Sequence, residues 1–230
     1  MFKRPHHQRI AKVLEALDGA VLAGYGMFFG GGTAIALRYG EYRESVDMDF
    51  LVSDVNGYRE IRQRMNNIDG MNPLLRVAGS VKAVREFRID QYGIRTLVAV
   101  DGFNIKLEII KEGYISLAPT GPKDQICGVP CLTPLDMATC KLMANADRWP
   151  ADAIYSRDLI DLAMMHPGRK LLEQAIQKAQ VPYGRTIETA LAKAADKLRT
   201  REGWMEKCMA AMKMDVPKAV LWQRLKDLGV

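Results

Sequence analysis

The sequence predicts an α+β protein of 230 residues, in which a mixed α/β body is followed by a helical region. Strand signals concentrate between residues 73 and 110, where β-branched and apolar runs are separated by Gly or Asp turns. From Thr133 onward the apolar spacing is helical and is interrupted only at Pro and Gly positions. These observations predict two domains, residues 1–130 and 131–230.

The first part of the body is predicted to alternate helices with short apolar runs. Residues 8–17 indicate a helix because their apolar side chains recur at helical spacing on one face. The other elements expected before residue 66 are an apolar run Tyr25–Phe29, a helix Ala34–Tyr39, a strand Val46–Val52 and a helix Tyr58–Met65.

The strand-rich segment comes next. The expected strands are Leu74–Val77, Val84–Ile89, Arg95–Val100 and Phe103–Ile110. The last of these alternates most clearly, so its apolar residues face one way and Asn104, Lys106 and Glu108 share the opposite face.

The helical region has a well-marked start. Thr133 is suited to cap a helix, Pro134 to occupy its first turn, and Asp136 lies three residues after the cap. Breaks between the later helices are expected at Pro167-Gly168, Pro182 through Gly184, Gly203 and Pro217.

Composition restricts the class of protein. No apolar run approaches the roughly 20 residues of a membrane span, and the basic N-terminus leads into an amphipathic stretch, so a cytoplasmic location is expected. The four cysteines lack the spacing of a zinc site and are expected to be buried thiols.

Residues 169–230 carry 13 Lys or Arg against 7 Asp or Glu, a net charge of +6. This favours a polyanionic partner such as RNA, with ordinary solvated helix faces as the alternative.

The chemistry is concentrated in a glycine-rich turn, Gly31-Gly32-Thr33, followed by Asp47 and Asp49. Two carboxylates two residues apart on a strand share a face and repel each other unless a cation intervenes. Mg²⁺, with Mn²⁺ as its substitute, is the natural hard cation for them. A glycine-rich turn that opens a helix offers N–H groups to phosphate. Together these features predict a site for transferring a nucleotide from an NTP.

Two segments, residues 31–38 and Arg43 through Phe50, resemble the signature of the AbiEii/AbiGii toxin family. That family belongs to the DNA polymerase β-like nucleotidyltransferase superfamily. The resemblance implies a small mixed sheet that bears the carboxylates, a helical domain, a cognate antitoxin encoded nearby, and a role in a toxin–antitoxin or phage-defence system. Related members transfer nucleotides to tRNA, which makes tRNA or another RNA a candidate acceptor.

The resemblance resumes over residues 133–165 and implies roles for single residues. Asp47 and Asp49 would bind the metal, and Gly32 with Thr33 would hold the triphosphate. Lys141 would contact phosphate, which agrees with its position on one helix face with Met137 and Asn145. Asp158 would be the acid of the last motif, and Asp161 one turn later is the alternative.

The remaining candidates come from strand alternation and position. Glu108 is favoured as a third carboxylate because it lies on the polar face of its strand, and Asp101, beside Gly102, is the competitor. Arg43, immediately before the Ser45–Asp49 run, is a candidate for binding phosphate. Trp149 is expected to pack in the core, with stacking on a nucleobase as the alternative.

The expected activity is therefore metal-dependent nucleotidyl transfer, in which Asp47, Asp49 and Glu108 form the acidic site and Lys141 steadies the triphosphate. One alternative keeps this chemistry and replaces RNA with a small molecule or a protein as acceptor. The other is a non-catalytic relative that binds nucleotides or RNA. The paired carboxylates argue against a pure binder, because such a protein has no need to hold two repelling charges together.

Overall fold

The computed structural model describes residues 2–65 and 70–229, which form two compact units. The first unit comprises Met1–Arg38 and Ser45–Thr133, and the second comprises Tyr39–Glu44 and Pro134–Val230. The second unit begins close to the boundary expected from the sequence, and it also includes Tyr39–Glu44, which the sequence did not assign to it. The predicted α+β class with a small mixed sheet is confirmed.

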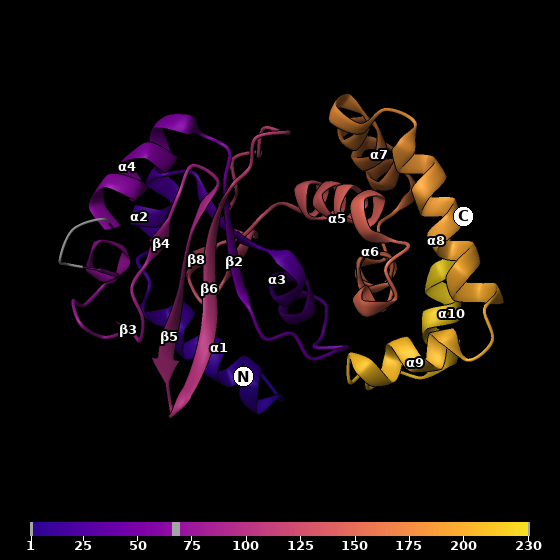
Figure 1. Ribbon diagram of the computed structural model, residues 1–230, viewed down its shortest axis with the longest axis horizontal. Helices are drawn as coiled ribbons and strands as arrows, with labels where there is room; N and C mark the ends of the chain where they lie inside the picture. Colours follow the sequence, from indigo (N-terminus) through magenta and orange to yellow (C-terminus); the bar gives the residue numbers. More distant parts are fainter. Residues whose placement is uncertain (1, 66–69, 230) are drawn as a thin grey trace. The chain divides into compact units, whose positions relative to one another are not determined.

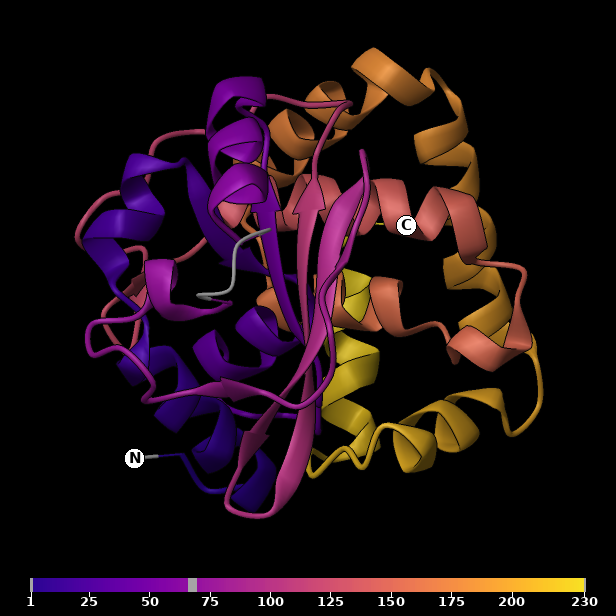
Figure 2. The same cartoon turned by 60° about the vertical axis from the view of Figure 1, so that its left-hand side comes forward.

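The sheet of the first unit has the strand order β1-β2-β6-β5-β3, and β4 also pairs with β5 (Figure 1). The strands are β1 (Met27–Gly30), β2 (Met48–Val52), β3 (Lys82–Ala83), β4 (Arg88–Ile89), β5 (Gly93–Val100) and β6 (Phe103–Lys111). The β2–β6 pair is parallel, whereas the β1–β2 and β5–β6 pairs are antiparallel. The long β5–β6 hairpin stands out in Figure 2.

On β2 and β6 the candidate carboxylates alternate with buried apolar residues. Met48 and Phe50 are fully buried, whereas Asp49 between them is partly exposed. Leu107 and Ile109 are buried on either side of the partly exposed Glu108. The period-two alternation predicted for β6 is therefore present, and it turns the acidic residues away from the core.

This unit contains the helices α1 (Pro5–Ala16), α2 (Gly19–Gly24), α3 (Gly31–Arg38) and α4 (Val55–Met65). A short hairpin follows, with β7 (Gln125–Ile126) and β8 (Val129–Pro130). The carboxylate of Asp18 accepts hydrogen bonds from the backbone N–H groups of Ala20 and Val21 and so caps α2. Helix α3 packs against β1 and β2.

The strand predicted at Leu74–Val77 is wrong. Asn72–Leu74 forms a 3₁₀ turn, η1, and Leu75 makes only an isolated bridge with Leu17. Pro73 explains the difference, because proline donates no ladder hydrogen bond and its fixed φ suits the start of a helical turn. Of the strand expected over Val84–Ile89, only Arg88–Ile89 forms one, as β4; β3 lies just before this range, and both pair with β5.

The second unit is helical apart from Tyr39–Glu44. Its elements are α5 (Pro134–Arg148), the 3₁₀ turn η2 (Asp152–Ile154), α6 (Arg157–Met165), α7 (Arg169–Tyr183), α8 (Thr186–Thr200), α9 (Trp204–Ala211) and α10 (Lys218–Asp227). Helix α5 packs against α6, α7 and α8. Helix α7 continues through Pro182 into its last turn, so the break expected there occurs at Gly184. Within the described ranges, no helix has the length and apolar character needed to cross a membrane.

Candidate active site

The glycine-rich turn lies directly against Asp49. Strand β1 ends at Gly30, which is the register partner of Asp49, and α3 begins at Gly31. Gly31 has a φ of +68°, and a Cβ placed on it would overlap the Asp49 carboxylate. Glycine is therefore required at this position for two reasons, the left-handed backbone and the close approach of the carboxylate.

Thr33 connects the start of α3 to the segment that precedes β2. It is 1% exposed, and its hydroxyl donates to the backbone carbonyl of Asp47 at 2.5 Å. Its oxygen also lies 2.8 Å from Ser45 Oγ. Because a hydroxyl has one proton, the Ser45 hydroxyl acts as donor in this second bond. The Thr33 side chain thus holds the backbone of Asp47 in place just before the first residue of β2.

Glu108 is the direct neighbour of Asp49 across the parallel β2–β6 pair. The competing carboxylate, Asp101, lies in the β5–β6 turn with a φ of +48° and pairs with Lys12 at 2.7 Å. The structure therefore places Glu108, and not Asp101, beside Asp49.

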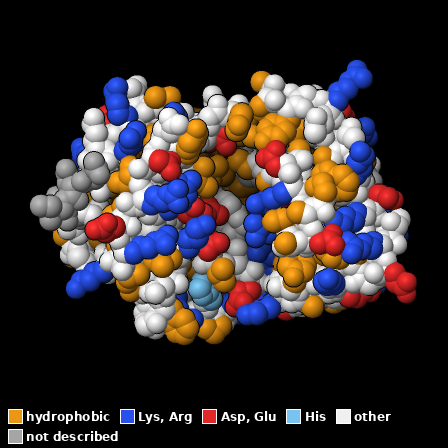
Figure 3. All heavy atoms as spheres, viewed as in Figure 1, with side chains coloured by type: hydrophobic (Ala, Val, Ile, Leu, Met, Phe, Trp, Pro, Cys, Tyr) orange, Lys and Arg blue, Asp and Glu red, His pale blue; other side chains and the backbone are white. Residues whose placement is uncertain are grey.

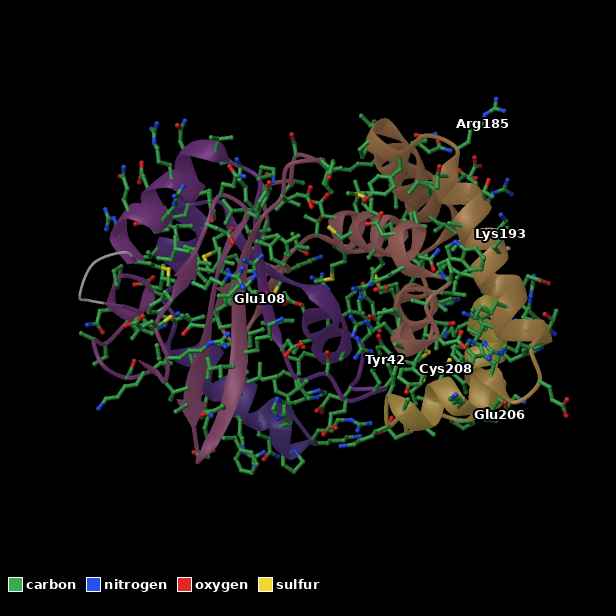
Figure 4. The ribbon with its side chains drawn as sticks, in the orientation of Figure 1. Tyr42, Glu108, Arg185, Lys193, Glu206 and Cys208 are labelled. Carbon is green, nitrogen blue, oxygen red and sulfur yellow. The ribbon has the colours of Figure 1, made fainter. Side chains whose placement is uncertain are left out.

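Two basic residues that the sequence reasoning did not assign to the site hold Glu108. Arg95 Nε lies 3.0 Å from Glu108 Oε1, and Lys106 Nζ lies 2.5 Å from Oε2. Figure 3 shows acidic side chains with Lys and Arg side chains beside them on this face, and Figure 4 marks Glu108. The alternation of β6 had already indicated that Lys106 and Glu108 share a face. The sequence therefore contained the signal that would have assigned Lys106 to the site.

Lys106 also interacts electrostatically with Asp47 and Asp49. Its pKa is raised, chiefly by the hydrogen bond to Glu108, which outweighs the opposing effect of burial. The charges of Asp47 and Asp49 raise the Lys106 pKa further. The ammonium group therefore lies within the electrostatic reach of three carboxylates, and the face is a mixed cluster of charges rather than a purely acidic one.

A divalent cation fits this arrangement only with help from a substrate. Over residues 2–65 and 70–229, no three His, Cys, Asp or Glu side chains are grouped so as to hold a metal. Because Glu108 is engaged by Arg95 and Lys106, a cation would be held mainly through Asp47 and Asp49. In sites that act on nucleotides, Mg²⁺ is held by one or two carboxylates together with substrate phosphates and water. Asp47 and Asp49 would supply the carboxylates of a site of this kind.

The other candidates from the sequence lie in the second unit and form a buried ionic cluster. The Asp161 carboxylate is fully buried and accepts hydrogen bonds from Tyr42 Oη at 2.6 Å and from Arg43 Nε and Nη2 at 2.6 and 2.8 Å. Lys141 Nζ lies 2.6 Å from Asp161 and 3.0 Å from Asp158. Arg148 completes the cluster by pairing with Asp158 at 2.6 Å. The sequence reasoning did not anticipate Tyr42 as a member.

Attraction between opposite charges outweighs desolvation in this cluster. Burial alone would raise the pKa of Asp161, but the charges of Arg43 and Lys141 hold it well below its usual range. Burial likewise opposes the charged form of Lys141, yet its pKa is raised by Asp161 and then Asp158. Arg43 and Lys141, which the sequence suggested as phosphate contacts, are thus both paired with carboxylates inside the helical unit.

One of the comparisons with known proteins identifies the family. A family model described as nucleotidyl transferase AbiEii toxin, type IV toxin–antitoxin system, matches residues 12–226. None of the curated proteins matches the chain. Among solved structures, JHP933 from Helicobacter pylori is 16% identical, with a TM-score of 0.46, over 100% of this chain and 95% of that one. A second H. pylori protein, described as a nucleotidyltransferase, is 13% identical, with a TM-score of 0.34, over 90% of this chain and 95% of that one.

The family match extends over nearly the whole length of the chain and includes every candidate residue named above. The resemblance seen in the sequence is therefore confirmed: this protein belongs to the AbiEii family of nucleotidyl transferase toxins of type IV toxin–antitoxin systems.

Proposed function

We propose that this protein transfers a nucleoside monophosphate from an NTP to a hydroxyl group of an RNA such as tRNA, and acts as the toxin of a toxin–antitoxin pair. The observation that carries the proposal is the β1–α3 turn, which places the start of a helix against Asp49, next to Glu108 on β6. Phosphate suits the helix N-terminus, and carboxylates beside it suit a cation bound to that phosphate.

In this reaction the acceptor oxygen forms a bond to the α-phosphorus, and the bond from that phosphorus to the bridging oxygen breaks. Pyrophosphate leaves, and the hydroxyl proton passes to a carboxylate of the cluster. A divalent cation, Mg²⁺ or Mn²⁺, held by Asp47 and Asp49 would supply positive charge for the triphosphate. Backbone N–H groups of Gly32 and Thr33 would orient the phosphates, and Lys106 with Arg95 would balance the remaining negative charge.

The choice of RNA as acceptor rests on charge. The excess of Lys and Arg after residue 168 gives that region a net charge of +6, and such regions attract polyanions. Lys141 and Arg43 would act in this scheme mainly by shaping the helical unit, because both are engaged by Asp161. The partner that neutralises the toxin would be an antitoxin encoded nearby.

The test is a labelling assay with each α-³²P-labelled NTP, Mg²⁺ and purified tRNA or total RNA. Asp49→Asn keeps the size of the side chain and removes its charge, and Asp101→Asn makes the same change in the β5–β6 turn. Label in RNA with wild type and Asp101→Asn, and none with Asp49→Asn, is the expected result. Label on a protein or on a small molecule would show that this molecule, and not RNA, is the acceptor. Absence of both label and pyrophosphate with every NTP would contradict the proposed activity.

A further inference from the structure

A hollow on the helical unit lies where the end of α5 meets α8. It has a volume of about 450 Å³ and is lined by Trp149, Ala192, Lys193, Asp196 and Lys197. Trp149 is half-buried, and Lys193 and Asp196 are exposed. An aromatic ring, a small apolar residue and charged residues of both signs thus surround one open cavity.

The backbone that carries Trp149 is held in place by Lys197. Its Nζ donates to the backbone carbonyls of Trp149 and Pro150 at 3.4 and 3.0 Å and pairs with Asp152 at 2.8 Å. Arg201 also pairs with Asp152. Because Lys197 is occupied in this way, it supports the segment after α5, and the backbone there needs less ordering when a ligand arrives.

Lys193 is not engaged in the way that Lys197 is. Its ammonium lies 5.9 Å from the centre of the Trp149 ring, and within the described ranges it forms no ion pair. Figure 4 shows Lys193 projecting outward from α8, with Arg185 farther along the same outer side. The ammonium lies over the ring on an exposed, flexible side chain. A nucleotide suits this pair because its base can stack on the ring when the lysine moves aside to meet the phosphate.

We propose that this hollow binds one unpaired nucleotide of the acceptor RNA, with its base against Trp149 and its phosphate against Lys193. The inference rests on the proposed function in that RNA is the acceptor. The Asp196 carboxylate on the rim can accept a hydrogen bond from an N–H group of the base, such as the exocyclic amino group of cytosine. The surface would thus hold a single-stranded part of the RNA.

Binding is measured on the full chain through quenching of tryptophan fluorescence by a single-stranded oligocytidylate. Trp149→Ala is expected to weaken binding about 5- to 100-fold and to abolish most of the quenching, as expected for loss of one base stack. Trp222→Ala, which removes another half-buried indole of the same unit, is the matched control and should bind as wild type does.

Charge is tested in the same way. Lys193→Ala should weaken binding several-fold more than Lys170→Ala, an exposed lysine on α7 outside the hollow. Thermal unfolding of each variant checks that the fold is intact.

Three results would overturn the inference: equal binding by Trp149→Ala and Trp222→Ala, equal effects of the two lysine changes, or equal competition by a blunt RNA duplex, whose bases are not free to stack.

Asp49→Asn separates this inference from the proposed activity. If that variant loses transfer but binds oligocytidylate like wild type, the hollow is an RNA site independent of catalysis. If wild type transfers label to RNA and Trp149→Ala does so equally well at limiting RNA, the hollow fails while the activity stands.

Discussion

Arg43 and Asp161, which are 118 residues apart in the chain, form a bidentate ion pair inside the helical unit. Arg43 lies in Tyr39–Glu44, the short segment that the chain contributes to this unit between α3 and β2. The pair therefore fastens this segment to α6. Its loss should affect the stability of the helical unit before it affects any chemistry at the sheet.

Asp161→Asn should lower the free energy of unfolding by about 3–5 kcal/mol, because it leaves buried cations without their partner. Urea denaturation followed by circular dichroism measures the change. Glu202→Gln, which neutralises an exposed acid in the same unit, is the control and should stay within about 0.5 kcal/mol of wild type. A loss below 1 kcal/mol in Asp161→Asn would show that the buried cluster is not stabilising.

The same carboxylate makes stability depend on pH. The pKa of Asp161 is lowered in the folded protein, whereas in the unfolded chain it is about 3.9. The stabilisation is therefore fully present above the unfolded value and is lost as pH falls from about 5 towards the folded pKa. Unfolding free energies measured from pH 7 down to pH 3 should fall more steeply for wild type than for Asp161→Asn. Parallel curves would contradict this assignment.

Gly31→Ala tests the turn against Asp49. A left-handed backbone costs an alanine about 1–2 kcal/mol, and the new methyl group would push the Asp49 carboxylate from its place. We expect a loss of stability of that size together with a large loss of nucleotidyl transfer. Gly24→Ala is the matched control, because that helical glycine has open space around its Cβ position and should be neutral or slightly stabilising. Full activity in Gly31→Ala would place the phosphate site elsewhere.

Lys106→Met tests whether the ammonium competes with the metal for the carboxylates. Removing this charge leaves Glu108, Asp47 and Asp49 less neutralised, so the Mg²⁺ concentration for half-maximal transfer should fall about two- to five-fold, a modest effect since the lysine is 41% exposed. Lys82→Met, an exposed lysine on β3, provides the comparison. An unchanged or higher Mg²⁺ requirement in Lys106→Met would show that the lysine does not oppose the cation.

Much of the fold could be read from local patterns. The alternation along Phe103–Ile110 placed Glu108 and Lys106 on one face, and the structure has both on the polar face of β6. Thr133 and Pro134 marked the start of α5. The strand expected at Leu74–Val77 failed because apolar runs of that length suit a buried turn as well as a strand, and Pro73 decided for the turn.

The sequence by itself determined the class of fold and the family, and it singled out Gly31, Asp47 and Asp49 as candidates, since these depend on local spacing and on residue types that only certain backbones and ions accept. Only the tertiary structure decided that Asp49 and Glu108 are neighbours and that Lys106 and Arg95 hold Glu108. It also decided that Lys141 joins Asp161 and Asp158 in a buried cluster. Strand pairing and ion pairing between residues far apart in the chain depend on how the chain packs. Packing also decides which other charges and how much water lie beside a charged group, and these set the free energy of its ionised form.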